Sequence, residues 1–420
     1  MGSEWPRIRF GNICENSAFG PRFSGDFYAI DGNVATLRTT DISEDGCIEY
    51  STMPHAKLDL SNLQQHILKE NDLVITRSGR VGTTAIFKNF QLPVLPGAFL
   101  IRFRLNREIA DPLFYRYFLN SPEGQELVLS TATGSVQQNL NITSLHLLDV
   151  PIPPLKIQHA IARILGSLDD KIELNRQMNE TLEAMARAIF QSWFVDFDPV
   201  RAKAEGRDTG LPPEVEALFP SEFEGVDGRE VPMGWGVNPL SESFDVRMGQ
   251  SPPGTTYNEN GNGMPFFQGR TDFGFRYPTV RVFCSEPMRF AEEGDTLVSV
   301  RAPVGDINLA QEKCCIGRGV ASVRHNTGSR SFTYYQMLSF KDIFSLFESE
   351  GTVFGSIAKT GFNSIECITP PDKIVDKFEK IVFPIDQKIE NNEKQSRTLA
   401  QIRDALLLKL MNEEIRVPTS

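Results

Sequence analysis

A long helical pattern that occurs twice is the feature of this sequence that most restricts its fold. The first copy is Pro153–Phe194 and the second is Pro370–Met411, and at a constant separation of 217 positions they share 13 identical residues in 42. Apolar residues recur every three or four positions along the first copy, the spacing of a helical stripe that packs on another helix. A helix with one apolar stripe needs a cover, so we expect the two copies to pair antiparallel.

The segments outside the helical copies recur more loosely. Asp72–Gly82 (DLVITRSGRVG) returns as Asp295–Gly305 (DTLVSVRAPVG). The sequence therefore predicts an α+β fold in which two mixed α/β units are separated by two long antiparallel helices, with a pseudo-twofold internal repeat. The expected parts are a first unit over residues 1–152, a helical spacer over 153–194, a linker over 195–232, a second unit over 233–369 and a second spacer over 370–415.

Local patterns in the first unit predict individual elements. Asp72–Thr76 and Ala98–Arg104 are typical of strands, because β-branched and aromatic residues dominate them. Asp111–Leu119 and Pro122–Thr131 are typical of helices that begin with a capping residue and proline. Residues 195–232 mix charge with proline and glycine, which is the composition of a linker.

Composition excludes several classes of protein. A chain of 420 residues suggests two to four structural units. No long uncharged apolar run and no signal-peptide pattern occur, so we expect a cytoplasmic protein. The six cysteines form no CxxC pair and the five histidines are scattered, so the sequence predicts neither a metal site nor a disulfide framework.

The charge balance has to be considered locally. Lys and Arg number 43 against 54 Asp and Glu, a net charge of −11, which argues at first against nucleic acid. Only the face that touches a nucleic acid needs to be basic, however. The run from Arg77 to Arg107 contains six basic residues and no acidic one, so it is a candidate for such a face.

The chain resembles the specificity subunits of type I restriction-modification systems over nearly its whole length. The resemblance rests on the order of units and helices and on four stretches of sequence. These are Pro153-Pro154-Leu155 leading into QHAIARILGSLDDKIE, the segment SWFVDFDPVRAKAEG (Ser192–Gly206), the entry Pro232-Met233-Gly234-Trp235, and Gly249-Gln250-Ser251-Pro252-Pro253. The second helical copy contains Pro384 and lacks the Trp-Phe ending of the first, so its match to the family is weaker.

The resemblance implies a function that composition does not reveal. The two units are then target recognition domains, each reading one half of an asymmetric, bipartite site in double-stranded DNA. The helices set the distance between the halves and dock two methyltransferase subunits, and restriction subunits complete the nuclease. The chain itself is then not an enzyme and holds no cofactor, while S-adenosylmethionine is bound by the partner methyltransferase subunits.

Polar loops supply the candidate DNA-binding residues. Arg and Gln are suited to bidentate recognition of guanine and adenine, and arginine beside a glycine-containing turn can also bind phosphate. The candidates are Arg38, Thr39, Arg77, Arg80, Gln137 and Gln138 in the first unit, and Gln268, Arg270, Arg301 and Lys359 in the second. A solvated or ion-paired side chain is the alternative at each position.

Two further sets of residues belong to the helices. Asn175 and Asn392 occupy matched positions and interrupt both apolar stripes, so they are candidates for fixing the helix register; alternatively, both lie on a solvated face. An aromatic group ends the first helix and is a candidate docking surface for a methyltransferase subunit, or else part of a core. Its members are Phe190, Trp193, Phe194 and Phe197.

Two other functions remain to be distinguished. A self-sufficient DNA methyltransferase is one, because Ser251-Pro252-Pro253-Gly254 resembles the motif of amino-methyltransferases. Glycine replaces the aromatic residue of that motif, and no glycine-rich turn for S-adenosylmethionine is visible. A coiled-coil scaffold that binds proteins and reads no DNA is the other.

Overall fold

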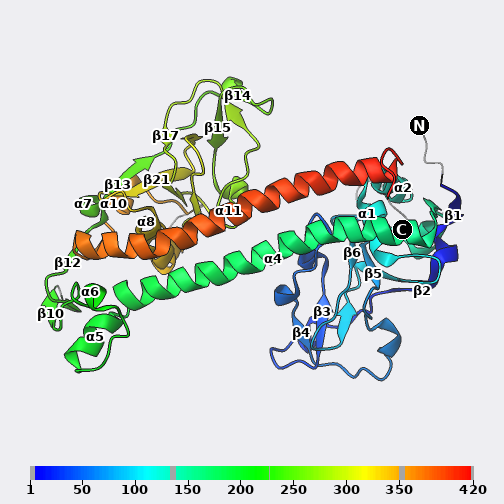
Figure 1. The fold of residues 1–420 in the computed structure, drawn as a ribbon, viewed down its shortest axis with the longest axis horizontal. Helices are drawn as coiled ribbons and strands as arrows, with labels where there is room; N and C mark the ends of the chain where they lie inside the picture. The colour runs from blue at the N-terminus through cyan, green and yellow to red at the C-terminus, as the bar shows by residue number, and fades with distance from the viewer. Residues whose placement is uncertain (1–4, 133–138, 227, 350–354, 418–420) are drawn as a thin grey trace. The chain divides into compact units, whose positions relative to one another are not determined.

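The computed structural model describes residues 5–132, 139–226, 228–349 and 355–417. The chain divides into two compact units, here called unit 1 (residues 1–175 and 394–420) and unit 2 (residues 176–393). Both boundaries fall inside long helices, α4 (Leu155–Phe194) and α11 (Asp372–Met411), so each helix gives one part to each unit (Figure 1). The two helical copies are thus 40-residue helices, and neither Gly166 nor Pro384 ends one.

Unit 1 is built on two small sheets. The four-stranded antiparallel sheet has the order β2-β8-β5-β6, and the three-stranded sheet has the order β4-β3-β7, with β3 and β7 parallel. Its strands are β1 (Arg7–Arg9), β2 (Cys14–Phe19), β3 (Val34–Leu37), β4 (His55–Ala56), β5 (Leu73–Thr76), β6 (Thr84–Ile86), β7 (Val94–Pro96), β8 (Leu100–Leu105) and β9 (Asp149–Pro151). Strands β1 and β9 pair separately. The predicted strands at 72–76 and 98–104 are therefore confirmed.

Helices α1 (Pro112–Asn120) and α2 (Pro122–Ser130) of unit 1 begin where the sequence predicts. Asp111 accepts hydrogen bonds from the N–H groups of Leu113 and Phe114, and Pro112 opens the helix. The helices are α1 (Pro112–Asn120), α2 (Pro122–Ser130) and α3 (Ile142–His146), and the 3-10 turns are η1 (Phe10–Ile13), η2 (Gly25–Phe27), η3 (Thr39–Asp41), η4 (Tyr50–Thr52) and η5 (Gln64–His66). The apolar faces of η1, α1, α2, α3, α4 and α11 contribute to one core.

Unit 2 repeats this plan. Its four-stranded antiparallel sheet has the order β13-β21-β18-β19, and its second sheet has the order β14-β16-β15-β20-β17, with β15 and β20 parallel. The strands are β10 (Phe223–Val226), β11 (Arg229–Pro232), β12 (Gly236–Pro239), β13 (Phe244–Met248), β14 (Tyr257–Asn258), β15 (Met264–Phe267), β16 (Phe283–Cys284), β17 (Phe290–Ala291), β18 (Thr296–Ser299), β19 (Ile307–Leu309), β20 (Cys314–Ile316), β21 (Val320–His325) and β22 (Glu366–Thr369). Strands β12 and β22 pair as β1 and β9 do.

The helices of unit 2 follow the same order as those of unit 1. They are α7 (Leu240–Ser243), α8 (Arg330–Ser339), α9 (Lys341–Ser349) and α10 (Lys359–Asn363), with 3-10 turns η6 (Gly254–Thr256) and η7 (Arg270–Asp272). Residues 195–232 carry α5 (Asp198–Ala204), α6 (Pro213–Glu216) and the β10–β11 hairpin, and bury Val200, Val215 and Phe219. The expected linker is therefore part of the unit 2 core, because its apolar residues are packed there.

Within each unit the two long helices run antiparallel. In unit 1 Asp169 of α4 binds Arg403 of α11, and Asn175 binds Ser396. In unit 2 Asn179 of α4 binds Glu393 of α11, and Phe190 contacts Phe378 further along both helices. The predicted antiparallel pairing is confirmed in each unit.

Candidate nucleic-acid interface

Unit 1 contains a cleft beside the turn between β7 and β8. The cleft has a volume of about 580 Å³ and is lined from the segments 21–28, 38–40 and 97–100. Arg22 and Arg38 both line it, and none of the described residues that line it is acidic. We call this the unit 1 cleft. Its lining also includes aromatic surface from Phe23, Tyr28 and Phe99, so it combines positive charge with apolar area.

Two of the predicted arginines in unit 1 are held in different ways. Arg38 is tied to Asp41, whose Oδ1 lies 2.6 Å from Nη2, and this hydrogen bond raises the pKa of Arg38. The guanidinium of Arg77 lies 4.7 Å from the ring centre of Phe19 and has no ion-pair partner in the described part of the chain. A ring contact fixes a guanidinium without using its donors. Nε of Arg77 is buried, so its terminal Nη groups are the donors left for a ligand, and Arg77 is better placed than Arg38 to bind one.

Unit 2 has a cleft that borders the equivalent turn, between β20 and β21. Its volume is about 650 Å³, and it is lined by Arg318 and by residues of the segments 248–249, 300–302 and 355–358. Arg301 is the second arginine, and again no described lining residue is acidic. We call this the unit 2 cleft. Neither arginine forms an ion pair with any described residue, so both charges are available.

Gln268 lies at the edge of the same turn. Its amide nitrogen donates to Ser251 Oγ over 3.0 Å, and the backbone N–H of Arg318 donates to the same hydroxyl over 3.2 Å. The structure therefore brings Gln268 close to Arg318. Lys359 is exposed at the start of α10, directly after the lining residue Ala358.

The remaining predicted DNA-binding residues fall elsewhere. Arg80 lies 3.5 Å from Glu44, and Arg270 lies 2.7 Å from Asp306, so both guanidiniums face carboxylates. Thr39 lines the unit 1 cleft. Gln137 and Gln138 lie outside the residues that the structure describes.

The basic run from Arg77 to Arg107 is not one binding face. Arg104 holds Asp72 with two hydrogen bonds of 2.7 Å, and Arg102 is 1% exposed. The same pair returns in unit 2, where Arg324 lies 2.5 Å from Asp295. These arginines lie on interior strands of the sheets and neutralise buried aspartates, so the sequence hypothesis of a continuous basic face is wrong.

Both register asparagines are buried and hydrogen-bonded. Asn175 donates to Gln395 Oε1 over 2.9 Å, and Asn392 donates to Asn179 Oδ1 over 2.8 Å. They are 0% and 3% exposed, so the alternative of a solvated face is wrong. A polar pair buried between helices favours one axial alignment, and fixing the register remains our prediction for these residues.

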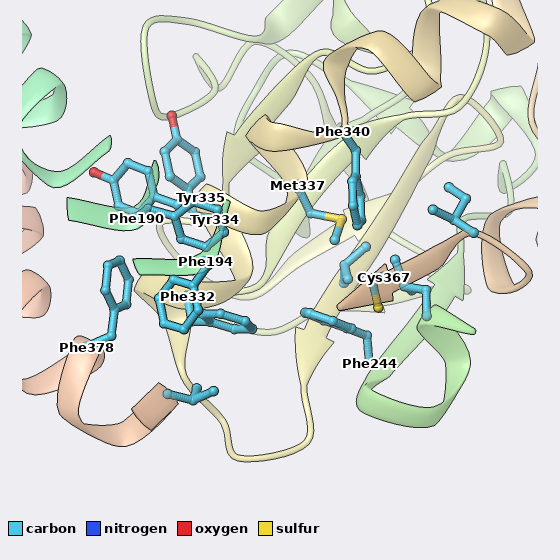
Figure 2. Packing of buried hydrophobic residues seen from close by; sticks show 14 of the residues in the cluster. Phe190, Phe194, Phe244, Phe332, Tyr334, Tyr335, Met337, Phe340, Cys367 and Phe378 are labelled. Carbon is cyan, nitrogen blue, oxygen red and sulfur yellow. The ribbon is translucent and has the colours of Figure 1, made fainter. Parts of the chain in front are cut away.

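The aromatic group that ends α4 is a core and not a free docking surface. Its members are 2–6% exposed. Phe190 and Phe194 contact each other and the rings of Phe332 in α8 and Phe378 in α11 (Figure 2), whereas Phe197 contacts Phe223 and Trp235. The group comprises Phe190, Trp193, Phe194 and Phe197. Their assignment to partner docking is therefore corrected, because so little of each side chain is left for a partner to touch.

Sequence reasoning missed several residues of the clefts, among them Arg22, Phe99 and Arg318. Phe99 and Arg318 stand in short turns with glycine, PGAF and IGRG, that follow apolar strands at equivalent places. The available signal was this repeated glycine. It was missed because the sequence around it differs between the copies.

Over the described ranges, no group of three or more His, Cys, Asp or Glu side chains could hold a metal ion. No helix there is long and apolar enough to span a bilayer.

Comparison with known proteins gives the same domain pattern. The family model for the type I restriction modification DNA specificity domain matches twice, at residues 5–184 and 232–401. The specificity subunit of the type I restriction enzyme HindI of Haemophilus influenzae is 27% identical over 475 residues, covering 98% of this chain and 100% of that protein. A protein of Methanocaldococcus jannaschii, provisionally named as the specificity subunit of the type I restriction enzyme MjaX, is 28% identical over 391 residues, covering 88% and 86%.

A solved structure shares the fold. The crystal structure of a type I restriction-modification S subunit from M. genitalium has a TM-score of 0.61 and 18% sequence identity, and the match covers 97% of this chain and 96% of that one. This likeness supports the arrangement of mixed units and long helices.

Proposed function

The chain belongs to the type I restriction modification DNA specificity family, and we propose that it reads a bipartite DNA site through its two arginine-lined clefts, one half-site for each unit. The observation that carries this proposal is local charge. In a chain of net charge −11, both clefts are lined by two arginines and by no acidic residue among those described. DNA binding requires such a cationic surface.

Differences between the clefts favour an asymmetric site. Unit 1 combines arginine with aromatic surface, whereas unit 2 presents two arginines without ion-pair partners beside a glutamine. Arginine and glutamine in a groove recognise guanine and adenine, and apolar side chains recognise the thymine methyl group. Two half-sites of different sequence are the expected consequence.

We further propose that the chain works without catalysing a reaction itself. The curated relatives are named as specificity subunits of restriction enzymes, which supports a place in an assembly with methyltransferase and restriction subunits. S-adenosylmethionine is then bound by the methyltransferase subunits. Isothermal titration of the isolated chain with S-adenosylmethionine should give no binding heat, and saturable binding would favour a self-sufficient methyltransferase.

Alanine at Arg22, which lines the unit 1 cleft, and at Arg301, which lines the unit 2 cleft, tests the two clefts separately. The chain assembled with its methyltransferase subunits would be mapped by sequencing methylated bases, and its DNA affinity measured by fluorescence anisotropy. Each variant should lose about 1–3 kcal/mol of discrimination, confined to one half-site, because a bidentate base contact is worth that much.

Arg247→Ala is the matched control. Arg247 is an exposed arginine of unit 2 that pairs with Asp245 on β13 and does not line the cleft. It should leave both half-sites unchanged. If Arg22→Ala and Arg301→Ala also bind and methylate the same sites with unchanged preference, the clefts do not read DNA.

A further inference from the structure

One short turn borders the cleft in both units and has a fixed backbone. In unit 1 the turn contains Gly97 and joins β7 to β8, and in unit 2 it contains Gly317 and joins β20 to β21. The N–H of Gly97 donates to Leu37 O over 2.8 Å, and that of Gly317 donates to Phe267 O over 2.9 Å. Each turn is therefore tied to the end of the neighbouring parallel strand in the same way.

Glycine contacts fix the position of the turn against a second loop. A Cβ on Gly20 would lie 2.1 Å from Gly97 O, and a Cβ on Gly249 would lie 2.2 Å from Gly317 O. Real Cβ atoms do not approach that closely, so bare backbone is required at both places. The two units thus hold the turn in equivalent positions by the same device.

The side chains that the turn presents differ between the units. Unit 1 presents Ala98 and Phe99, whose ring is 58% exposed, and unit 2 presents Arg318 between two glycines. Gly319 cannot carry a larger side chain in place, because its Cβ would lie 2.5 Å from Gln268 O. A constant backbone with a variable side chain at a cleft is what a specificity-determining element requires.

The backbone of Arg318 is also held in place by a hydrogen bond. Its N–H donates to Ser251 Oγ, which in turn binds the Gln268 amide, so the turn and the glutamine move together. With no described carboxylate in the cleft, the guanidinium keeps all its donors for a ligand.

We propose that this turn decides one base pair in each half-site: Arg318 binds a guanine through O6 and N7, and Phe99 contacts the methyl group of a thymine. The inference rests on the proposed function, since it takes the two clefts as the reading surfaces. The chemistry of each side chain selects the base, because arginine matches the paired acceptors of guanine and a phenyl ring matches the thymine methyl group.

The guanine contact is tested with modified DNA and the chain assembled with its methyltransferase subunits. The half-sites are first mapped by sequencing methylated bases with the wild-type assembly. Replacing one guanine by 7-deazaguanine removes N7 alone and should weaken wild-type binding roughly tenfold at one position of the unit 2 half-site. Arg318→Ala should bind normal and modified DNA equally and accept other bases there.

A second variant separates a base contact from a phosphate contact. Arg318→Lys keeps the charge but loses the fork, so it should lose discrimination at that position while keeping the salt dependence of binding. A uniform loss of affinity in Arg318→Ala, with a salt slope reduced by about one and an unchanged site, would show a phosphate contact and overturn the inference.

The thymine contact is tested by replacing thymine with deoxyuridine, which removes only the methyl group. Wild-type binding should fall roughly threefold to fourfold at one position of the unit 1 half-site, and Phe99→Ala should show no such fall. Leu147→Ala is the matched control, since Leu147 is a 61% exposed apolar residue of the same unit that does not line the cleft. Equal sensitivity of wild type and Phe99→Ala at every thymine would refute this half of the inference.

Transplanting the turn gives the strictest test. The double variant Ala98→Arg with Phe99→Gly installs the unit 2 turn in unit 1, and it should replace thymine by guanine at one position without changing the unit 2 half-site. If the wild-type assembly shows no sequence preference, the proposed function itself fails. If the wild type is specific and the transplant keeps the original site, only the turn assignment fails.

Discussion

Each unit has a matched aspartate on one of its long helices, and this aspartate forms ion pairs with different side chains in the two units. In unit 1 the carboxylate of Asp169 accepts hydrogen bonds from Arg116, Arg403 and the hydroxyl of Tyr117 over 2.6–2.8 Å. The matched residue in unit 2 is Asp386, 217 positions later. Its carboxylate accepts hydrogen bonds from Arg276 over 2.7 Å and from the hydroxyl of Tyr335 over 3.0 Å. The carboxylate of Glu183 lies 3.8 Å from the same arginine. The aspartate thus pairs with two arginines in unit 1 and with one in unit 2, where Glu183 lies near that same arginine.

This difference shows how the repeat has been kept. The aspartate and the tyrosine stay at matched places, while the arginines come from different elements: α1 and α11 in unit 1, and the loop after η7 in unit 2. What both units retain is a buried charge network between the globular part and a long helix. The sequence around the network can change as long as the charges remain compensated.

The largest effect that separates the units is expected from Asp169→Asn. It leaves buried Arg116 with no described ion-pair partner and beside a like charge, so unit 1 should lose about 3–5 kcal/mol of unfolding free energy. Asp386→Asn leaves Glu183 near Arg276 and should cost unit 2 about 1.5–3 kcal/mol. Urea unfolding followed by hydrogen exchange in peptides of each unit measures both.

Asp404→Asn serves as the control for unit 1, because Asp404 is 63% exposed and pairs with the same Arg403. It should cost less than about 1 kcal/mol. If Asp386→Asn destabilises unit 2 as much as Asp169→Asn destabilises unit 1, the two charge networks do not differ in their contribution to stability.

A smaller difference should appear on mild acidification. His325 ends β21 in the core of unit 2, where Leu105 ends β8 in unit 1, and burial lowers the pKa of His325 below its ordinary value of 6.5, against the opposing effects of Asp372 and Asp376. A lowered histidine pKa contributes stability above pH 6.5 that is lost as the pH falls through the folded-state pKa. Each tenfold reduction of proton affinity on folding corresponds to a loss of about 1.4 kcal/mol in the free energy of unfolding at low pH.

Protonation of His325 should therefore lower the stability of unit 2 between pH 7.5 and pH 5, a contribution that unit 1 lacks at the matched Leu105. His325→Leu should reduce that loss, and unit-resolved urea midpoints at both pH values measure it. A pH dependence of unit 2 that survives the substitution unchanged would assign the acid sensitivity to other groups.

The smallest effect concerns helix caps. Asp111 caps α1 through its own carboxylate, whereas α8 is capped by Ser329 and also by Glu379 of α11, which accepts from the N–H groups of Arg330 and Ser331. Asp111→Ala should cost about 1 kcal/mol. Ser329→Ala should cost less, because Glu379 still satisfies the exposed N–H groups, and thermal unfolding of both variants checks the order. Equal losses would show that Glu379 contributes little.

Much of the fold could be predicted from local patterns. The two long helices, the strands at 72–76 and 98–104 and the caps of α1 and α2 depend on residues close together in the sequence. The repeat itself was visible because helix pairing constrains the same positions in both copies. The linker was the exception, because proline and glycine hid the few apolar residues that join it to the core.

The candidate site could be predicted only in part. The sequence singled out Arg38, Arg77 and Arg301. The structure places Arg38 and Arg301 on clefts, and the backbone N–H of Arg77 donates to the O of the lining residue Phe99. The sequence singled out Arg80 and Arg270 as well, but in the structure these two arginines face Glu44 and Asp306. For the aromatic ending of α4 it left a docking surface and a core as alternatives, and the structure buries those rings in a core.

The sequence by itself determined that this chain contains two related mixed units joined to two long helices. Periodicity, capping and internal identity are properties of the order of residues. Only the tertiary structure decided which arginines are free and which turn borders both clefts. An ion pair such as that of Arg104 with Asp72 joins residues that are distant in sequence, and whether a charge is compensated depends on that distance in space. The chemistry of the clefts is therefore a result of folding and not of composition.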